Sequence, residues 1–301
     1  MKGLITGIKR MAIHDGAGVR TTVFFKGCPL NCIWCHNPED IHFGKELAFY
    51  ERKCIGCGTC TMACPKHAIS MCAGKPRIDK VNCLECGEEC TKNCPTGAMT
   101  LHGESWDPDA LAEVLLQDQP FYDASGGGVT LSGGECLAQP EFATELAKIL
   151  YEKGISVDID TCGYASRNVM ERIVPYVDTF LYDLKAVDPD VHRKCTGKDN
   201  TIILDNLRYL SQNGCNIEIR YPYVKNYNDG ECTKIATFLQ GMPGITKVKV
   251  LGYHSYASAK YDALGMKNTL PNVSVSVADV DEAVAILRSY GLNAVNGMRD
   301  D

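Results

Sequence analysis

The distribution of cysteines constrains this chain more than any other feature. The sequence has 17 cysteines in 301 residues, and eleven of them form three groups between positions 28 and 94. The remaining six have no ligand spacing and are Cys72, Cys136, Cys162, Cys195, Cys215 and Cys232. The N-terminus, "MKGLITGIKRMAIHDGAG", has no apolar core and no cleavage site, which predicts a cytoplasmic protein. Because cytosolic thiols stay reduced, so many cysteines predict metal binding rather than disulfides.

The remaining composition excludes several classes of partner. No run of apolar residues approaches the roughly 20 that are needed to span a bilayer. A formal net charge of −6 argues against electrostatic binding of nucleic acid or anionic lipid. We therefore expect a monomeric protein with no nucleic-acid or membrane partner.

The second and third cysteine groups resemble each other. Cys54-x2-Cys57-x2-Cys60-x3-Cys64-Pro is the bacterial ferredoxin run, in which the fourth cysteine ligates the other of two clusters. The third group repeats this run with one extra residue, Glu88 or Glu89, between its second and third cysteines. The predicted ligand sets of two [4Fe–4S] clusters are Cys54, Cys57, Cys60 and Cys94, and Cys83, Cys86, Cys90 and Cys64. Two zinc ribbons remain an alternative, although zinc sites usually combine two cysteine pairs.

The first group, Cys28-x3-Cys32-x2-Cys35, supplies three thiolates and no fourth. Its C-x-x-C-H portion is compatible with haem attachment or a redox dithiol, and His36 could complete a zinc site. A [4Fe–4S] cluster on three cysteines would instead keep one iron open for a ligand that is not protein.

The rest of the chain alternates between predicted strands and helices, which is typical of a parallel α/β fold. The predicted strands are Thr21–Lys26, Val129–Ser132, Ile155–Asp160, Thr179–Asp183, Asn216–Arg220 and Lys247–Leu251. Helices are predicted from the Asp107-Pro108 cap to Gln117, over Glu141–Glu152 and over Asn200–Gln212. Six such strands predict a partial (β/α)6 TIM-like barrel, which would carry its chemistry at the C-terminal ends of the strands.

All six predicted strands end in groups that can bind a charged ligand. These groups are the cysteine trio, Ser132-Gly133-Gly134-Glu135, Asp160-Thr161, Asp183-Leu184-Lys185, Arg220 and Tyr253-His254. Any one of them could be an ordinary solvated loop. Because the C-terminal ends of parallel strands meet at one edge of a sheet, together they predict one shared site.

The trio, with Trp34 before its last cysteine, resembles the signature of the radical S-adenosylmethionine enzymes. The resemblance implies that the open iron chelates the amino and carboxylate groups of S-adenosylmethionine. One electron then cleaves the sulfonium S–C5′ bond. Under this hypothesis Gly133 and Gly134 can bring backbone carbonyls close to the ammonium, because they lack side chains. Asp160 and Asp183 supply negative charge near it.

Four further residues suit the same ligand. Lys185 and His254 could bind its carboxylate. Arg220 could reach either the carboxylate or the ribose. Trp34 offers an apolar wall for the adenine, although a buried core tryptophan is an equally ordinary interpretation.

Several longer motifs resemble the glycyl radical enzyme activating enzymes, in the subgroup with a two-cluster ferredoxin-like insert. They are "HDGAGVRTTVFFKGCPLNCIWCHNPE", the two ferredoxin runs, "LSGGE", "DTCGY", "YDLK", "CTGKDN", "IRYPYVKNYND" and "LGYHSYASAKYDALG", in the family's order from about Ile13 to Gly265. Two positions depart from the family pattern, namely Ala17, where proline is usual, and the extra residue in the third cysteine group.

The resemblance implies roles for the site residues. Gly133, Gly134 and Glu135 would bind the methionine ammonium. Asp160 and Asp183 would help hold a monovalent cation, Na⁺ or K⁺, beside the carboxylate. Lys185 and His254 would contact that carboxylate.

The resemblance also implies a reaction and a domain organisation. Flavodoxin or ferredoxin would deliver an electron, and a 5′-deoxyadenosyl radical would take hydrogen from a glycine Cα of a partner glycyl radical enzyme. The expected divisions are 1–50 for the start of the barrel, 51–101 for the insert and 102–301 for the rest of the barrel. Two alternatives stay open, a radical enzyme that modifies another peptide or small molecule and a polyferredoxin-type electron-transfer protein.

Overall fold

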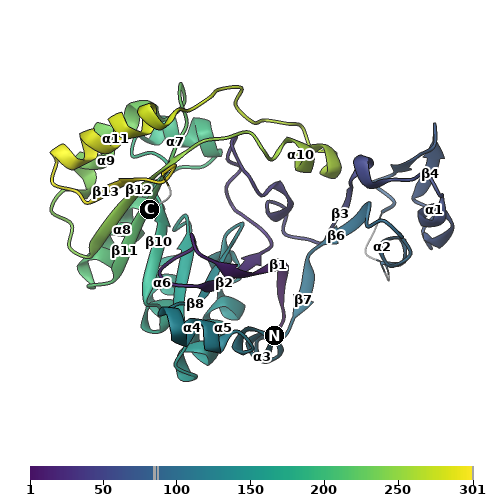
Figure 1. The fold of residues 1–301 in the computed structure, drawn as a ribbon, viewed down its shortest axis with the longest axis horizontal. Coiled ribbons are helices and arrows are strands. Elements are labelled where there is room, and N and C mark those ends of the chain that lie inside the picture. Colours follow the sequence, from purple (N-terminus) through teal and green to yellow (C-terminus); the bar gives the residue numbers. More distant parts are fainter. Residues whose placement is uncertain (84–85, 87, 300–301) are drawn as a thin grey trace.

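The main body is built on one nine-stranded sheet with helices outside it (Figure 1). A computed structural model describes residues 1–83, 86 and 88–299. The six predicted strands are present and lie side by side in chain order, each parallel to the next. They are β2 (Arg20–Phe25), β8 (Gly128–Gly133), β9 (Ser156–Thr161), β10 (Thr179–Asp183), β11 (Asn216–Tyr223) and β12 (Ile245–Gly252).

Three strands of this sheet were not predicted. β1 (Gly3–Ala12) pairs antiparallel with β2, and β7 (Glu104–Trp106) pairs antiparallel with β1. β13 (Ala294–Asn296) extends the other edge parallel to β12. The sheet is therefore wider than the six-stranded prediction at both edges.

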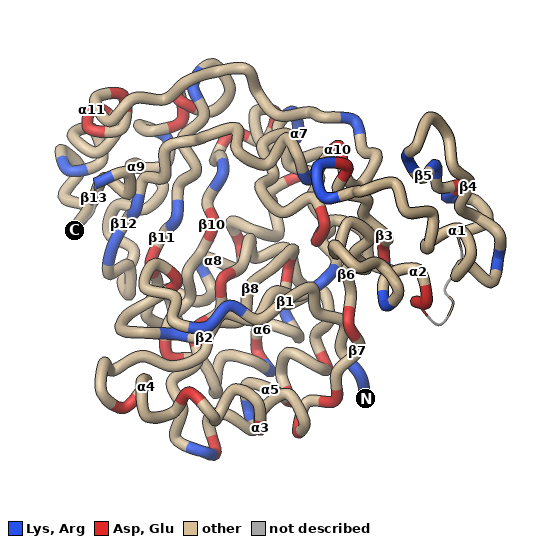
Figure 2. The backbone as a smooth tube through the Cα atoms, turned by 45° about the vertical axis from the view of Figure 1, so that its right-hand side comes forward, with Lys and Arg blue, Asp and Glu red and all other residues tan. Residues whose placement is uncertain are grey.

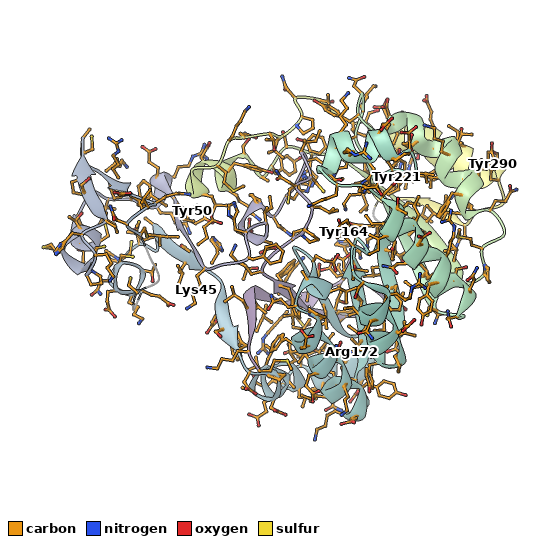
Figure 3. All side chains as sticks on the ribbon, turned by 180° about the vertical axis from the view of Figure 1, so that it is seen from behind. Lys45, Tyr50, Tyr164, Arg172, Tyr221 and Tyr290 are labelled. Atoms are coloured by element: carbon orange, nitrogen blue, oxygen red, sulfur yellow. The ribbon has the colours of Figure 1, made fainter. Side chains whose placement is uncertain are left out.

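Amphipathic helices cover the outer face of the sheet. Asp107 caps α3 as predicted, because its side chain accepts a hydrogen bond from the Asp109 backbone N–H. α5 buries Phe142, Leu146 and Leu150 in the hydrophobic core. Tyr221 of β11, labelled in Figure 3, belongs to the same core. The helices of the body are α3 (Pro108–Leu116), α4 (Gln119–Ser125), α5 (Pro140–Glu152), α6 (Arg167–Ile173), α7 (Pro189–Thr196), α8 (Thr201–Gln212), α9 (Cys232–Leu239), α10 (Ser258–Leu264) and α11 (Val277–Ser289).

The segment from Glu46 to His102, called the insert lobe below, stands beside the body (Figure 1). Its base is a two-stranded antiparallel sheet of β3 (Glu46–Phe49) and β6 (Met99–His102). Its outer part holds α1 (Thr59–Ala63), α2 (Glu89–Lys92) and a hairpin of β4 (Ile69–Cys72) and β5 (Lys75–Ile78). Because β3 pairs with β6, the lobe leaves and rejoins the body at neighbouring points.

Short 3₁₀ turns connect several of these elements. They are η1 (Pro38–Asp40), η2 (Glu51–Lys53), η3 (Cys136–Ala138), η4 (Val174–Tyr176) and η5 (Asp229–Glu231). Basic and acidic residues are interspersed over both the body and the insert lobe (Figure 2). Among the described helices none is long and apolar enough to cross a membrane.

Candidate active site

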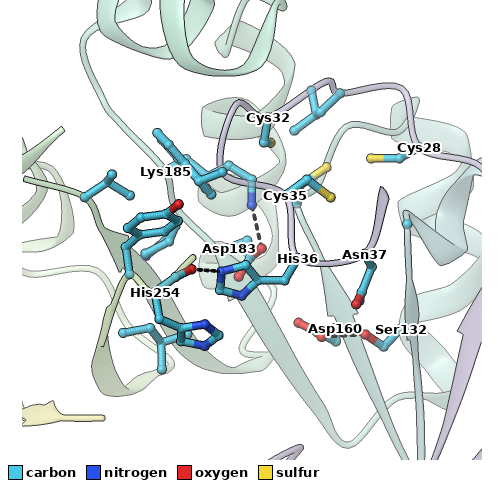
Figure 4. Close-up of a pocket in the computed structure, with 18 of the residues that line it drawn as sticks. Cys28, Cys32, Cys35, His36, Asn37, Ser132, Asp160, Asp183, Lys185 and His254 are labelled. Atoms are coloured by element: carbon cyan, nitrogen blue, oxygen red, sulfur yellow. Dashed lines mark hydrogen bonds and ion pairs between the residues drawn. The ribbon is translucent and has the colours of Figure 1, made fainter. Parts of the chain in front are cut away.

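A cavity of about 640 Å³ opens at the C-terminal ends of the parallel strands. The cysteine trio forms part of its wall, and side chains from the ends of β8, β9, β10 and β12 form another part (Figure 4). Predicted site residues that line it are Cys28, Cys32, Trp34, Cys35, Gly133, Gly134, Asp160, Asp183, Lys185 and His254. The fold therefore brings together groups that lie more than 200 positions apart in the sequence.

The cysteine trio lies on an irregular loop whose backbone is tied down on both sides. Cys28 N–H donates to the Ile41 carbonyl at 3.0 Å, and Ile33 N–H donates to the Cys195 carbonyl at 2.9 Å. Burial raises the pKa of the Cys28, Cys32 and Cys35 thiols. Such thiols ionise readily only beside a cation, so the trio suits iron, which stabilises the thiolate form.

Charged side chains of both signs face the trio across the cavity. Lys185 Nζ lies 2.5 Å from Asp183 Oδ2. Burial alone would lower the pKa of Lys185, but attraction to Asp183 and to the thiols of Cys32 and Cys162 outweighs it and raises that pKa. These residues stand two apart at the end of β10, where alternate side chains share a face of the sheet.

Asp160 lies at the end of β9 in a buried polar setting. Ser132 Oγ donates to its Oδ2 at 2.6 Å, and Arg220 Nη1 lies 3.4 Å from the same oxygen. Burial raises the pKa of Asp160 to about 6, and the Arg220 guanidinium opposes that rise. A further cation beside this carboxylate would favour its ionised form.

Two of the nine predicted ligand-contact residues, Glu135 and Arg220, lie behind the cavity wall. Glu135 is 0% exposed. Its Oε1 accepts from Thr161 Oγ1 at 2.7 Å and its Oε2 from Cys162 N–H at 2.8 Å, so the carboxylate ties β8 to β9. Arg220 donates from Nη2 to the His14 carbonyl at 2.9 Å, and its Nη1 lies 3.4 Å from Oδ2 of the cavity-lining Asp160. The other seven line the cavity.

Three buried asparagines hold the loops that carry the site. Asn206 Nδ2 donates to the Gly163 carbonyl at 2.9 Å, in the loop after β9. Asn228 Nδ2 donates to the Lys185 carbonyl at 2.8 Å, and Asn200 Nδ2 donates to the Ala186 carbonyl at 3.0 Å, in the loop after β10. The motifs "CTGKDN" and "IRYPYVKNYND" thus supply structural supports to the site.

Several lining residues were not predicted. His36 and Asn37 directly follow the trio, which was the available signal for them. Cys162 lines the cavity although its lack of ligand spacing had placed it among the solitary cysteines. Gly297 and Met298 come from the chain just after β13, a strand too short to be predicted.

The cysteines of the insert lobe meet at two much smaller cavities, and Cys54 also borders an outer opening of about 770 Å³ beside α10. One, of about 20 Å³, is lined by Cys54, Cys57, Cys60 and Cys94 together with apolar side chains. The other, of about 60 Å³, is lined by Cys83, Cys86 and Cys90. Cys64 is buried beside it and interacts electrostatically with Cys83 and Cys90, raising the pKa of both thiols after the larger effect of burial. Each fourth cysteine therefore lies with the other run, as crossover ligation requires.

The chain matches two protein families along its length. Residues 81–239 match the radical SAM superfamily, and residues 53–98 match the 4Fe-4S dicluster domain. The chain is 39% identical over 297 residues to the choline trimethylamine-lyase activating enzyme of Oleidesulfovibrio alaskensis, covering 96% of both chains. It is 41% identical over 272 residues to the trans-4-hydroxy-L-proline dehydratase activating enzyme of Clostridioides difficile, covering 89% of both. The chain belongs to the glycyl radical enzyme activating enzymes.

This membership confirms the predicted family and makes the protein a radical S-adenosylmethionine enzyme with iron–sulfur clusters whose partner is a glycyl radical enzyme. The fold class is also confirmed. Streptococcus suis SuiB, solved with precursor peptide SuiA, superposes with a TM-score of 0.53 at 14% identity, covering 89% of this chain and 46% of SuiB. The activating enzyme is thus an α/β protein with a partial barrel and a dicluster insert.

Proposed function

We propose that the 640 Å³ cavity is where this activating enzyme cleaves S-adenosylmethionine and generates the radical passed to its partner. The observation that carries the proposal is the wall of the cavity, where three cysteines face Asp160, Asp183 and Lys185. When bound, a [4Fe–4S] cluster and S-adenosylmethionine together supply a one-electron cleavage whose radical product removes hydrogen from a glycine Cα. The chain itself orients these groups and excludes water.

We assign the polar wall to the methionine portion of S-adenosylmethionine. Gly133 and Gly134 bring the backbone close to its ammonium. Lys185 and His254 face its carboxylate, while Asp160 and Asp183 hold a monovalent cation, Na⁺ or K⁺, beside it. Trp34, which is buried at the cavity wall among apolar residues, faces the adenine.

In the proposal, Glu135 and Arg220 do not contact the ligand and instead position the residues that do. Glu135 fixes the strand ends that carry Gly134 and Thr161, and Arg220 fixes Asp160. Their contacts support a positioning role rather than direct binding.

The proposed cofactor content is three [4Fe–4S] clusters. Cys28, Cys32 and Cys35 would hold the catalytic one. The two small cavities of the insert lobe, with their four-cysteine sets, support complete protein ligation of the other two. Since clusters without an open iron suit electron transfer, we assign them to electron delivery from flavodoxin or ferredoxin.

The proposed partner is a glycyl radical enzyme of the lyase or dehydratase kind, as named for the relatives. We further propose that the enzyme is a cytoplasmic monomer, with the divisions 1–50, 51–101 and 102–301. The pairing of β3 with β6, which brackets residues 51–98, supports an insert in this region.

The test is to reduce the purified, anaerobically reconstituted protein and supply S-adenosylmethionine without any partner. The proposal predicts methionine and 5′-deoxyadenosine in about equal amounts. Adding a candidate glycyl radical enzyme of the lyase or dehydratase kind should then give a glycyl radical signal in electron paramagnetic resonance. Cleavage without any glycyl radical would instead favour a radical enzyme with another substrate, and no cleavage would favour an electron-transfer protein.

A further inference from the structure

The motif "LGYHSYASAKYDALG" contributes more to the structure than the single residue His254. Its second half forms α10, which lies between the body and the insert lobe (Figure 1). α10 contacts η1, just after the cysteine trio, and it also contacts β3 at the base of the lobe. This short helix therefore contacts both the insert lobe and the end of the loop that carries the cysteine trio, residues 27–37, which is called the catalytic loop below.

On its inner side, α10 binds the end of the cysteine loop through two side chains. Lys260 Nζ donates to the His36 carbonyl at 3.0 Å, to Asn37 Oδ1 at 3.2 Å and to Glu39 Oε1 at 2.6 Å. The buried Tyr261 donates from its hydroxyl to the Cys35 carbonyl at 3.2 Å.

These contacts matter because the loop has no regular secondary structure. Residues 27–37 lie in neither a helix nor a strand, so their carbonyl groups need partners from elsewhere in the fold. Lys260 and Tyr261 supply those partners at two consecutive residues, Cys35 and His36. Two side chains of α10 therefore hold the backbone at and just after the third cysteine of the trio.

On its outer side, α10 is fixed to the insert lobe. Lys80 Nζ donates to the Leu264 carbonyl and also lies 3.9 Å from Glu46 Oε1. Ala263 and Leu264 pack against Ala48 of β3 in a small apolar cluster. Tyr50 packs against the same cluster, at the junction of the lobe and the body (Figure 3).

A network of charged side chains connects the inner and outer sides of α10. Glu46 Oε2 lies 3.7 Å from Lys26 Nζ, and Lys26 in turn donates to the Glu39 carbonyl at 2.5 Å. Glu39 accepts from Lys260, which closes a ring through η1, α10, the lobe and the end of β2. Lys26 and Glu39 are largely buried in the protein, so a change at one member leaves others poorly paired.

We propose that α10 is the structural link between the insert lobe and the catalytic loop, with Lys260 and Tyr261 as positioning residues for Cys35. Neither residue touches a cofactor in this role. The link keeps the third cysteine of the trio oriented and couples its position to the lobe. The inference rests on the proposed role of the trio.

Variants Lys260→Met and Tyr261→Phe test the link, because both keep most of the side-chain volume. The matched control is Lys267→Met, an exposed lysine three residues beyond α10 with no hydrogen bond to the loop among the described contacts. Loss of residues that orient metal ligands typically costs about 10- to 100-fold in metal affinity or activity. We expect cleavage to slow about tenfold or more in Lys260→Met and less in Tyr261→Phe.

Two readouts separate positioning from general damage. The first is hydrogen exchange at the amides of Asp40 and Ile41, which bond within η1 and should exchange faster in both variants but not in the control. The second is the electron paramagnetic resonance signal of the catalytic cluster with and without S-adenosylmethionine. That signal should change while the insert signals stay as in the wild type, and Lys260→Arg should restore part of it.

The connection to the lobe has its own variant. Lys80→Met does not touch the catalytic loop, yet it should raise exchange at Asp40 and Ile41 if α10 transmits the change. Unchanged exchange in Lys80→Met, or Lys260→Met behaving like Lys267→Met in exchange and spectrum, would overturn the link. Exchange can be measured whether or not the wild-type protein cleaves S-adenosylmethionine, so failure of the proposed function would be recognised separately.

Discussion

The two kinds of cysteine group in this molecule lie in opposite surroundings. Cys28, Cys32 and Cys35 line a cavity of about 640 Å³ that they share with charged side chains. The cysteines of the insert lobe line cavities of about 20 and 60 Å³, the smaller of which is closed by apolar residues such as Ile55 and Met71. The catalytic trio therefore borders a space large enough for a ligand, whereas the spaces between the cysteines of each insert set are small. Cys54 also borders an outer opening of about 770 Å³ where the lobe meets α10.

The proposed ligation assigns different work to the two regions. A cluster ligated by four cysteines would have no open coordination position, which would suit the insert lobe to electron transfer. The catalytic loop needs its position controlled from outside, because it carries one ligand fewer and no regular secondary structure. The ring of contacts through α10 supplies that control.

The largest expected effect comes from removing the three-cysteine group. Changing Cys28, Cys32 and Cys35 together to alanine should remove about four of about twelve irons and all cleavage of S-adenosylmethionine. Iron analysis and product quantification measure both effects. Retained cleavage in this variant would assign catalysis to another site and would contradict the proposed difference between the trio and the insert cysteines.

The next largest effect concerns the charged wall. Asp183→Ala should weaken binding of S-adenosylmethionine by at least about tenfold, or ~1.4 kcal/mol, because it removes the partner of the buried Lys185. Equilibrium binding to the reconstituted protein measures this, whatever the electron source. The control is Asp123→Ala, an exposed carboxylate in α4, which should bind like the wild type.

A selective effect is expected in the insert lobe. Changing Cys57 and Cys86 to alanine should damage both inserted clusters while the catalytic loop still binds S-adenosylmethionine. Activation driven by a protein reductant should then fall far more than cleavage driven by a strong chemical reductant. If both fell equally in a folded protein that kept its first cluster, the lobe would have to take part in binding or radical chemistry.

The smallest effect is expected at the six solitary cysteines. Serine at any of them should leave the iron content unchanged, because none has ligand spacing and free cysteine commonly behaves as a small hydrophobe where it is buried. Cys162→Ser is the most demanding case, since this thiol lines the catalytic cavity. Loss of a whole cluster from any single variant would refute the ligand sets proposed above.

The sequence predicted the parallel strands because each is a short apolar run that ends in polar residues. It missed β13, which has only three residues, and β1, where exposed residues interrupt the apolar pattern. Met298 was missed for the same reason. It follows β13, and without that strand the sequence does not indicate that Met298 lies at the cavity.

The site itself was predicted in part for similar reasons. Asp183 is the last residue of β10 and Lys185 follows two positions later, and their place after a predicted strand assigned both to the site. Glu135 follows two glycines at a bend, where spacing does not say which way a side chain turns, and the structure directs it behind the wall to Cys162. The contacts of Lys260 with His36 and Glu39 join residues more than 220 positions apart, which no local pattern reveals.

The central claim, that only the three-cysteine site has an iron open to S-adenosylmethionine, has one direct measurement. Electron–nuclear double resonance on the reduced protein can detect coupling between a cluster and ¹⁵N in the amino group of labelled S-adenosylmethionine. We predict this coupling in the wild type and in the Cys57→Ala, Cys86→Ala double variant, and none when Cys28, Cys32 and Cys35 are all alanine. Coupling that survives in the triple variant, or disappears from a double variant that keeps its first cluster, would contradict the account.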